Sequence, residues 1–197
     1  MTVILASASG ARKRMLEEAG VTVTSDAPAI DEAAVKRIAA AGGHDVANAA
    51  GTLAELKARR VAARHRGALI IGADQILACQ GGWYDKPATV AEARTQLVSL
   101  RGHSHTLTSA AVIMRDNRVI WRRAESAGLT MRAFSDTFLD AYLARIGDEV
   151  CQTVGAYRIE GLGLQLFSRI DGDHFVILGM PLLPLLEALR DLGELQT

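Results

Sequence analysis

Cysteine is scarce in this sequence, since Cys79 and Cys151 are the only two among 197 residues. They lie far apart, form no Cys-x-x-Cys pair and have no companion histidine pattern. That spacing argues against a disulfide framework and against a zinc site. We therefore expect two reduced thiols and a cytoplasmic location.

An excess of charge of one sign is also missing. The 22 lysines and arginines equal the 22 aspartates and glutamates, so the formal net charge at pH 7 is zero. A surface for nucleic acid or for anionic membranes would need a basic excess. We expect neither partner, although a small polyanion held in one basic pocket is compatible with this balance.

Long hydrophobic runs are absent as well. The apolar run 3–5 is too short for a secretory signal and is soon followed by Arg12. The longest apolar stretch, 175–186, is short for a membrane span and contains Gly179 and Pro181. We interpret it as a core segment.

No internal repeat or low-complexity linker divides the chain. Hydrophobic residues make up 49% and charged residues 22% of the sequence, which is ordinary for a globular protein with a substantial core. At this length we expect one domain over residues 1–197.

The first twenty residues predict an anion site. An apolar strand, 3–5, leads through small residues to Ser9, a natural N-cap for a helix that ends at Gly20. The first-turn N–H groups and the helix dipole favour an anion there. Arg12 and Lys13 stand in that turn against the dipole, which also suggests an anionic ligand. The alternative is an ordinary strand, cap and helix that bind no phosphate.

A second informative stretch, 68–79, reads as a buried central strand interrupted by Asp74. A buried carboxylate is costly unless it is paired, protonated or bound to a metal. Because sites in α/β proteins lie at strand ends, we favour a functional carboxylate. The alternative is a turn aspartate at the strand end, which Gly72 makes reasonable.

Other charged residues stand at helices or in extended segments. Asp31 and Glu32 precede a predicted helix, and they are either functional or plain first-turn acids that complement the dipole. Lys57 lies in a long helix whose later arginines we expect on a solvated face. Lys86 precedes Pro87, which holds its backbone extended.

The remaining pattern predicts further elements and offers two weak leads. Predicted helices cover 33–41, 45–66, 90–100, 136–145 and 181–192, and predicted strands cover 21–24, 107–114, 119–131, 164–170 and 175–178. His103 and His105 are two positions apart, which would place both on one face of a strand, where they could bind a metal. The more common alternative is a pair of turn residues that bind no metal. No nucleophile elbow supports a serine hydrolase.

Seven motifs, taken in order, resemble those of the Maf family of nucleoside triphosphate pyrophosphatases. They are Leu5-Ala6-Ser7-Ala8-Ser9 with Arg12 and Met15-Leu16, Asp31-Glu32, Lys57-Ala58, Gly72-Ala73-Asp74, Lys86-Pro87, Gly155-Ala156-Tyr157 and Gly179-Met180-Pro181. Each is weak alone, but together they span nearly the whole chain. The resemblance implies an α/β fold related to the inosine triphosphatase-like group, with a mixed twisted sheet flanked by helices and two lobes around a cleft.

Two departures and two matches bear on the substrate. Gly10 replaces the family's usual proline, and Ala11 replaces a larger residue before Arg12. Gln75 and Glu160 look like the branch that acts on 7-methyl-GTP, whereas threonine and glutamine are usual in the branch that acts on dTTP and UTP. A carboxylate at Glu160 suits the positive charge and the N–H groups of a methylated guanine.

The resemblance implies hydrolysis between the α and β phosphates, which gives a monophosphate and pyrophosphate and removes non-standard nucleotides. Ser9, Arg12 and Lys13 would hold phosphate oxygens. Lys57 and Lys86 would neutralise the triphosphate and the leaving group. Glu32 and Asp74 would bind Mg²⁺ or Mn²⁺, and Asp74 would also take the proton of the attacking water.

A homodimer is also implied by the resemblance. Three other readings stay open: a dTTP/UTP pyrophosphatase of the same family, a phosphatase that releases orthophosphate, and a non-catalytic nucleotide-binding regulator of septum formation. The intact set of charged residues favours an enzyme over a pure binder.

Overall fold

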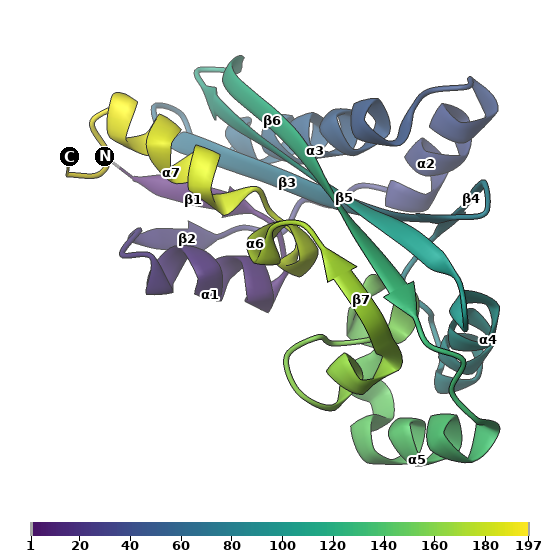
Figure 1. Cartoon of the computed structure of the whole chain (residues 1–197). Coiled ribbons are helices and arrows are strands. Elements are labelled where there is room, and N and C mark those ends of the chain that lie inside the picture. Colours follow the sequence, from purple (N-terminus) through teal and green to yellow (C-terminus); the bar gives the residue numbers. More distant parts are fainter. Residues whose placement is uncertain (1, 197) are drawn as a thin grey trace. The chain divides into compact units, whose positions relative to one another are not determined.

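A seven-stranded sheet runs through residues 2–196, the part of the chain that the computed structural model describes (Figure 1). Its strands lie in the order β2-β1-β3-β5-β6-β7, and β4 pairs with β3 off this path. β1 runs parallel to β2 and β3, whereas β4 and β7 are antiparallel to their partners β3 and β6. A mixed sheet flanked by helices was predicted, and this α/β class is confirmed.

The strands are β1 Val3–Ala6, β2 Val23–Ser25, β3 Leu69–Cys79, β4 Gly82–Tyr84, β5 Ser104–Arg115, β6 Arg118–Met131 and β7 Phe167–Asp171. The α-helices are α1 Gly10–Glu18, α2 Glu32–Ala41, α3 Val46–Ala62, α4 Val90–Leu100, α5 Asp136–Ile146, α6 His174–Leu178 and α7 Leu182–Asp191. Short 3₁₀ helices are η1 Gly147–Gln152, η2 Val154–Ala156 and η3 Leu162–Leu166.

The contacts within the chain divide it into two compact units. Unit 1 comprises residues 2–75, 108–126 and 173–196, and unit 2 comprises residues 76–107 and 127–172. The chain passes from one unit to the other within β3, β5 and β6 and between β7 and α6. The two units therefore share strands and are not joined by a separate linker.

In unit 1, the two faces of β3 pack against different helices. Leu69 and Ile71 belong to the same buried apolar cluster as Leu185 and Leu189 of α7. Because successive strand residues point to opposite faces, Gly72 points the other way, and there it meets α3. Figure 1 shows α7 in front of β3 and α3 behind it. The sheet of unit 1 is thus covered on both faces.

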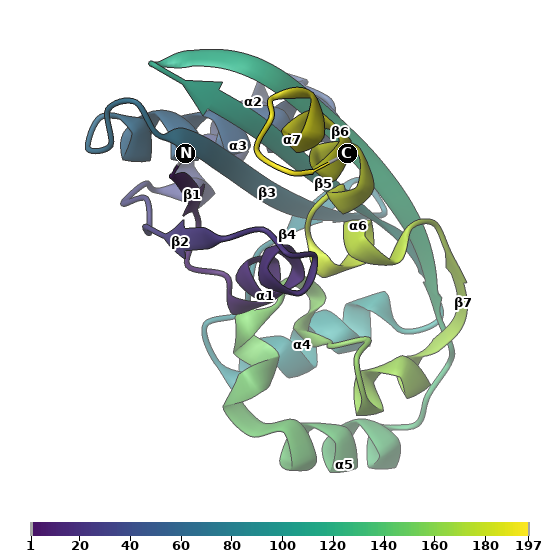
Figure 2. The same cartoon turned by 90° about the vertical axis from the view of Figure 1, so that its left-hand side faces the viewer.

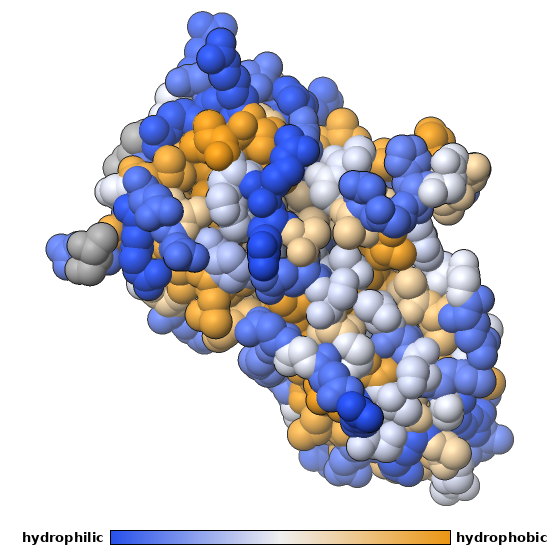
Figure 3. All heavy atoms as spheres, turned by 45° about the horizontal axis from the view of Figure 1, so that its top comes forward, coloured by the Kyte–Doolittle hydropathy of each residue, from blue (hydrophilic) through white to orange (hydrophobic). Residues whose placement is uncertain are grey.

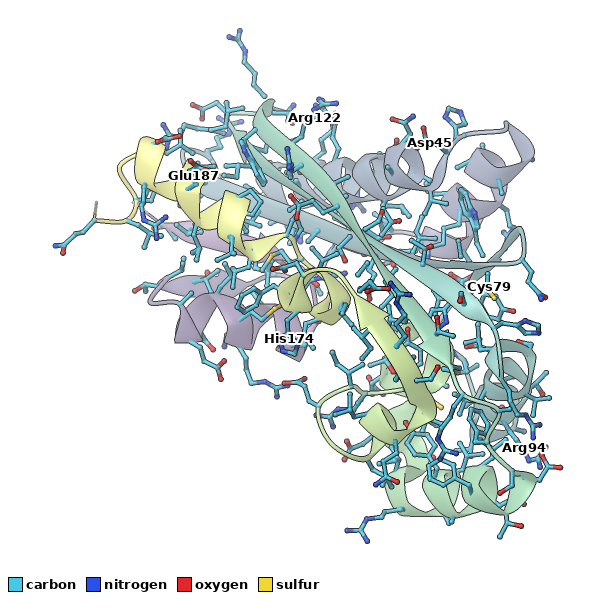
Figure 4. The ribbon with its side chains drawn as sticks, viewed as in Figure 1. Asp45, Cys79, Arg94, Arg122, His174 and Glu187 are labelled. Atoms are coloured by element: carbon cyan, nitrogen blue, oxygen red, sulfur yellow. The ribbon has the colours of Figure 1, made fainter. Side chains whose placement is uncertain are left out.

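In unit 2, α4 and α5 pack against each other, as Figure 2 shows. Arg94 of α4, labelled in Figure 4, donates from Nε to a carboxylate oxygen of Asp140 on α5 over 3.1 Å. Tyr142 of α5 is buried, and its hydroxyl donates to the carbonyl of Ala156 over 3.3 Å. These contacts tie α5 both to α4 and to the segment that follows η1.

The predicted strand 175–178 is wrong, because these residues belong to α6. The Asp173 carboxylate caps that helix by accepting from the Val176 N–H, and Gly179 ends it with φ 114°. A short apolar run does not distinguish a strand from a buried helix, and the cap residue decides here. The predicted strand 164–170 is also partly wrong, since η3 occupies its first residues and β7 begins at Phe167.

The surface carries no single large apolar group of side chains in the view of Figure 3, where hydrophobic and hydrophilic residues alternate in small groups. The exposed large hydrophobic residues are spread over separate elements: Ile38, Leu56, Val98, Ile120, Leu164 and Leu183. Within residues 2–196, no helix has the length and apolar character needed to cross a membrane.

Candidate functional site

The loop after β1 forms the start of the candidate site. β1 ends at Ala6, which pairs with Gly72, and β1 lies between β2 and β3 in the sheet. α1, which follows β1, and α3, which lies between β2 and β3 in the chain, pack on opposite faces of the sheet, so this is a topological switch point, where ligands of α/β proteins commonly bind. Ser9 caps α1 as predicted, because its Oγ accepts from the Arg12 N–H over 3.4 Å.

Gly72 brings α3 close to β3. A Cβ on Gly72 would lie 2.1 Å from the Ala54 carbonyl oxygen and 2.9 Å from the Ala58 side chain, so only glycine fits. Lys57 shares the face of α3 that carries Ala54 and Ala58. Asp74, two residues after Gly72, shares the same face of β3. The close approach of helix and strand therefore places Lys57 over Asp74.

Lys57 joins two carboxylates from different elements. Its Nζ lies 2.5 Å from Asp74 Oδ1 and 2.8 Å from Glu32 Oε1. The side chains of Lys57 and Asp74 are 5% and 3% exposed, whereas that of Glu32 is 44% exposed. The group thus has a buried end at Asp74 and an end open to solvent at Glu32. We call Arg12, Glu32, Lys57 and Asp74 the charge cluster.

Arg12 enters the charge cluster from α1 with its guanidinium held by backbone oxygens. Its Nε donates to the Gly179 carbonyl over 2.8 Å, and one terminal nitrogen donates to the Ala73 carbonyl over 3.1 Å and to Ser7 Oγ over 3.4 Å. Gly179 has φ 114°, and a Cβ there would lie 3.3 Å from Arg12 Nε. Burial lowers the pKa of Arg12, and the negative charges of Asp74 and Glu32 oppose that shift.

Asp31 and Glu32 have different roles in the fold. Asp31 is the N-cap of α2, and its Oδ1 accepts from the Ala34 N–H over 2.9 Å. Glu32 instead reaches Lys57. Burial alone would raise the pKa of Glu32, but the charge and hydrogen bond of Lys57, with the charges of Lys36 and Arg12, lower it overall. The first-turn explanation therefore holds for Asp31 and is insufficient for Glu32.

Asp74 Oδ2 is buried and has no hydrogen-bond partner. An unpartnered carboxylate oxygen away from water is unfavourable, and such an atom in a native fold is explained by a bound water, an ion or a catalytic role. Carboxylate oxygens are the donors that Mg²⁺ and Mn²⁺ prefer. Within residues 2–196, no group of three His, Cys, Asp or Glu side chains is arranged to bind a metal. The residues present fit a cation that takes its remaining ligands from phosphate and water.

Gln75 lies on the face of β3 opposite to that of Asp74. Its side-chain nitrogen donates to the carbonyls of Val176 and Ile177, both over 3.0 Å, and to Ser109 Oγ over 3.1 Å. The side chain of Lys13, one residue beyond Arg12, is 44% exposed, and its Nζ lies 3.4 Å from Glu17 Oε1. The adjacent residues therefore differ in their contacts: Arg12 is held by groups from other segments, whereas Lys13 contacts only Glu17 of its own helix among the ion pairs described.

Lys86 and Glu160 belong to unit 2, where both are exposed. Lys86 follows β4 and stands before the buried Pro87. Glu160 stands just before Gly161, which has φ 115°. The structure thus brings Arg12, Glu32, Lys57 and Asp74 together within unit 1 and carries Lys86 and Glu160 on unit 2.

The histidine pair does not form the expected turn or a metal site. His105 is buried in β5, and its Nε2 lies 2.7 Å from the Tyr157 hydroxyl, whereas His103 is exposed and contacts Gln80. The Gly-Ala-Tyr motif explains this packing. A Cβ on Gly155 would lie 2.6 Å from Leu77 Cδ1, so glycine lets the Tyr157 segment pack closely.

Sequence reasoning missed Lys36 and Ser109, which are both buried near predicted site residues. Lys36 stands one helical turn after Glu32, and the appearance of a lysine at that spacing could have singled it out. Ser109 offers no such signal, since a serine inside an apolar strand is unremarkable until its partners are known.

Comparisons with known proteins show which family this chain resembles. A family model described as "Maf-like protein" matches residues 2–192. A "nucleoside triphosphate pyrophosphatase" of Paramagnetospirillum magneticum is 56% identical over 192 residues, which cover 98% of this chain and 99% of that protein. A "7-methyl-GTP pyrophosphatase" of Rhizobium meliloti is 46% identical over 193 residues, which cover 98% and 97%.

Proposed function

The chain belongs to the Maf family, and from that membership we propose that it hydrolyses a nucleoside triphosphate between the α and β phosphates. The products are a monophosphate and pyrophosphate, and the preferred substrate is 7-methyl-GTP. The observation that carries the proposal is the charge cluster, in which a buried lysine joins two carboxylates beside the N-terminus of α1.

The start of α1 supplies the phosphate contacts in this proposal. Its first-turn N–H groups point outward beyond the Ser9 cap, and the helix dipole favours an anion. Three bonds hold the Arg12 guanidinium in place, so its charge is pre-oriented at this helix end. Lys13 adds a charge that is less firmly held. Such fixed donors stabilise the charge that develops as the anhydride bond breaks.

Glu32 and Asp74 would hold the divalent cation. Asp74 offers its unpartnered Oδ2, and Glu32 offers a carboxylate at the solvent-exposed end of the cluster. When bound, Mg²⁺ or Mn²⁺ supplies Lewis-acid polarisation of the phosphate and a more acidic bound water. Through the cation, the two carboxylates would link the buried end of the charge cluster to the phosphate of the substrate.

Asp74 is also the base of the proposed reaction. A carboxylate at this position can accept the proton of the attacking water, provided that its other oxygen is held still. The 2.5 Å contact of Oδ1 with Lys57 holds it. Lys57 and Lys86 offset the negative charge of the triphosphate and the leaving pyrophosphate, which no neutral residue in their places would do.

Gln75 and Glu160 would select the base. Among the relatives, those of Rhizobium meliloti and Mesorhizobium japonicum are named 7-methyl-GTP pyrophosphatases, and the latter is 45% identical to this chain. A carboxylate such as Glu160 accepts from the N–H groups of guanine and favours the positive charge of its methylated ring. These two residues therefore support 7-methyl-GTP over dTTP or UTP.

Product analysis tests the proposal. The full chain is incubated with Mg²⁺ and a panel of 7-methyl-GTP, GTP, dTTP, UTP and ATP, and pyrophosphate and orthophosphate are measured separately. We expect pyrophosphate, with the highest kcat/KM for 7-methyl-GTP. Orthophosphate would indicate a phosphatase, and binding without any product would indicate a regulator. A preference for dTTP or UTP would assign the other branch.

A further inference from the structure

One face of α4 holds the segment that carries Lys86. Glu92, Gln96 and Ser99 follow one another at helical spacing, so their side chains share one face of α4. Each of them bonds a different residue of 84–88, the stretch that leads from the end of β4 to the start of α4. We call residues 84–88 the Lys86 segment. The segment and α4 both belong to unit 2.

Two of these contacts fix the backbone on either side of Lys86. Gln96 Nε2 donates to the carbonyl of Asp85, directly before Lys86, over 3.0 Å. The Ala88 N–H donates to Glu92 Oε2 over 2.8 Å. A backbone that is bonded at both ends of so short a stretch has few conformations left to it.

The third contact and a proline complete the restraint. The Ser99 hydroxyl has a single proton and donates it to the Gln96 carbonyl over 2.8 Å. The Tyr84 hydroxyl, 3.0 Å from Ser99 Oγ, must therefore donate to it. Pro87 is buried, and a proline keeps the residue before it extended. Lys86 is itself exposed, so its backbone is held while its side chain faces solvent.

The Gln96 amide has little value for the fold alone. Its Oε1 is buried and has no hydrogen-bond partner within residues 2–196. The gain from the bond to Asp85 is offset by this unpartnered oxygen. Methionine has nearly the same shape and would fill the same space without a buried polar atom. A role in placing Lys86 gives a reason for an amide at this position.

We propose that Gln96 is a positioning residue that acts through Lys86. By fixing the backbone before Lys86, it keeps the ammonium group ready for the leaving pyrophosphate. Glu92 and Ser99 assist by holding the rest of the segment. This inference rests on the proposed function and extends it to α4. A cation on a fixed backbone binds an anion more tightly than one on a mobile loop, because less freedom is lost on binding.

Binding of inorganic pyrophosphate to the full chain, measured by calorimetry, tests the proposal. Gln96→Met should raise the Kd about threefold, and Lys86→Ala should raise it about tenfold. In the Lys86→Ala background, Gln96→Met should cause no further loss, because Gln96 acts only through that lysine. Thr95→Ala is the matched control, since the Thr95 hydroxyl donates to the Ala91 carbonyl within α4 over 3.1 Å. It should bind as the wild type does.

Backbone nitrogen relaxation of Lys86, measured by NMR without ligand, tests the restraint itself. Its order parameter should be about 0.85 in the wild type and in Thr95→Ala, and clearly lower in Gln96→Met. The melting temperature of Gln96→Met should stay within about 3 °C of the wild type. Ser99→Ala, at an exposed position, is a second variant that should show the same pattern with a smaller effect.

The possible results separate this inference from the proposed function. If Lys86 is equally rigid in all variants, α4 does not hold it. If Gln96→Met loosens Lys86 and leaves pyrophosphate binding unchanged, or weakens it equally without Lys86, then Gln96 is no positioning residue. If the wild type binds no pyrophosphate and releases none from a triphosphate, the proposed function fails and with it the role of Lys86. The relaxation data then still decide whether α4 fixes the segment.

Discussion

The two units bury polar groups in contrasting ways. Unit 1 buries the ionisable pair Lys57 and Asp74, with Arg12 and Glu32 nearby. Unit 2 buries His105 against Tyr157 and Phe167, all with neutral side chains. Burial lowers the pKa of His105 to about 4 and raises that of Tyr157, so both are uncharged at neutral pH.

Asp74 Oδ2 in unit 1 and His105 Nδ1 in unit 2 are among the buried polar atoms that lack a hydrogen-bond partner. A neutral ring nitrogen that lacks a bond costs much less than a carboxylate oxygen in the same position. The burial of His105 and Tyr157 in unit 2 therefore needs no ligand to explain it. The charge cluster of unit 1 is explained better by a ligand, and this difference between the two regions can be tested.

The largest expected effect is in the charge cluster. Asp74→Asn keeps the size of the side chain but removes its charge and its basicity. We expect a stable fold and a loss of at least about a hundredfold in kcat, the scale of a lost general base. Turnover of 7-methyl-GTP and a thermal melt measure both quantities.

Asp31→Asn is the matched control for that variant. Asn and Asp are equally good N-caps, so α2 should keep its start, and Asp31 has no contact with Lys57 among its hydrogen bonds described here. Its turnover should stay within about twofold of the wild type. Near-normal turnover in Asp74→Asn would show that Asp74 takes no part in the chemistry. The buried polar groups of unit 1 would then be structural, as those of unit 2 are.

The second-largest expected effect is a pH dependence of the free energy of unfolding that arises in unit 2. The pKa of His105 in the fold, about 4, is below its usual 6.5, so the unfolded chain binds a proton first as the pH falls. The free energy of unfolding should therefore decrease between pH 6.5 and about 4, by at most about 3.5 kcal/mol, since each pKa unit is worth about 1.4 kcal/mol.

His105→Gln should flatten this dependence, because glutamine does not titrate. Denaturant unfolding at pH 7 and pH 4.5 measures the difference, and hydrogen exchange at Tyr157 assigns it to unit 2. If both proteins lose the same stability, acid sensitivity comes from other groups. Glu32 is one, since its pKa is lowered in the fold and its contribution also disappears as the pH falls.

The contrast between the units also shows what sequence reasoning could reach. Elements with strong local signals were predicted closely: the helix predicted over 90–100 coincides with α4, which Thr89 caps, and the helix predicted over 136–145 begins where α5 begins, after the Ser135 cap. Gly72 and Asp74 were identified from the continuous apolar run over 68–79, because such a run depends on a single element. The fold class was implied by the resemblance to the Maf family.

What the sequence could not provide depends on contacts between distant segments. The three bonds of Arg12 reach Ser7, Ala73 and Gly179, and the Gly179 contact spans 167 positions. The burial of His105 depends on Tyr157, 52 positions away. No local sequence pattern predicts either of these contacts. The prediction of a strand over 175–178 was wrong for a local reason, because Asp173 caps a helix there and a short apolar run is typical of strands and buried helices alike.

The third effect concerns a residue of unit 2 that we place in substrate selection. Glu160→Gln should lower the preference for 7-methyl-GTP over GTP by about tenfold, because the amide loses the charge that favours a positive base. Its kcat on GTP should change little. A substrate ranking identical to the wild type would show that Glu160 does not contact the base.

The smallest effect separates two adjacent cations. Lys13 stands on the surface beside Glu17, and such exposed pairs contribute little. Lys13→Ala should raise KM about twofold and leave kcat unchanged, which corresponds to about 0.4 kcal/mol. Arg12→Lys should be far more harmful, because a lysine has no planar fork to reach Gly179, Ala73 and Ser7 together. If instead Lys13→Ala abolished binding and Arg12→Lys did not, the phosphate would be held by the exposed charge. The partly buried hydrogen bonds of Arg12 would then serve only to fasten α1 to the sheet, in the same structural way that His105 and Tyr157 serve unit 2.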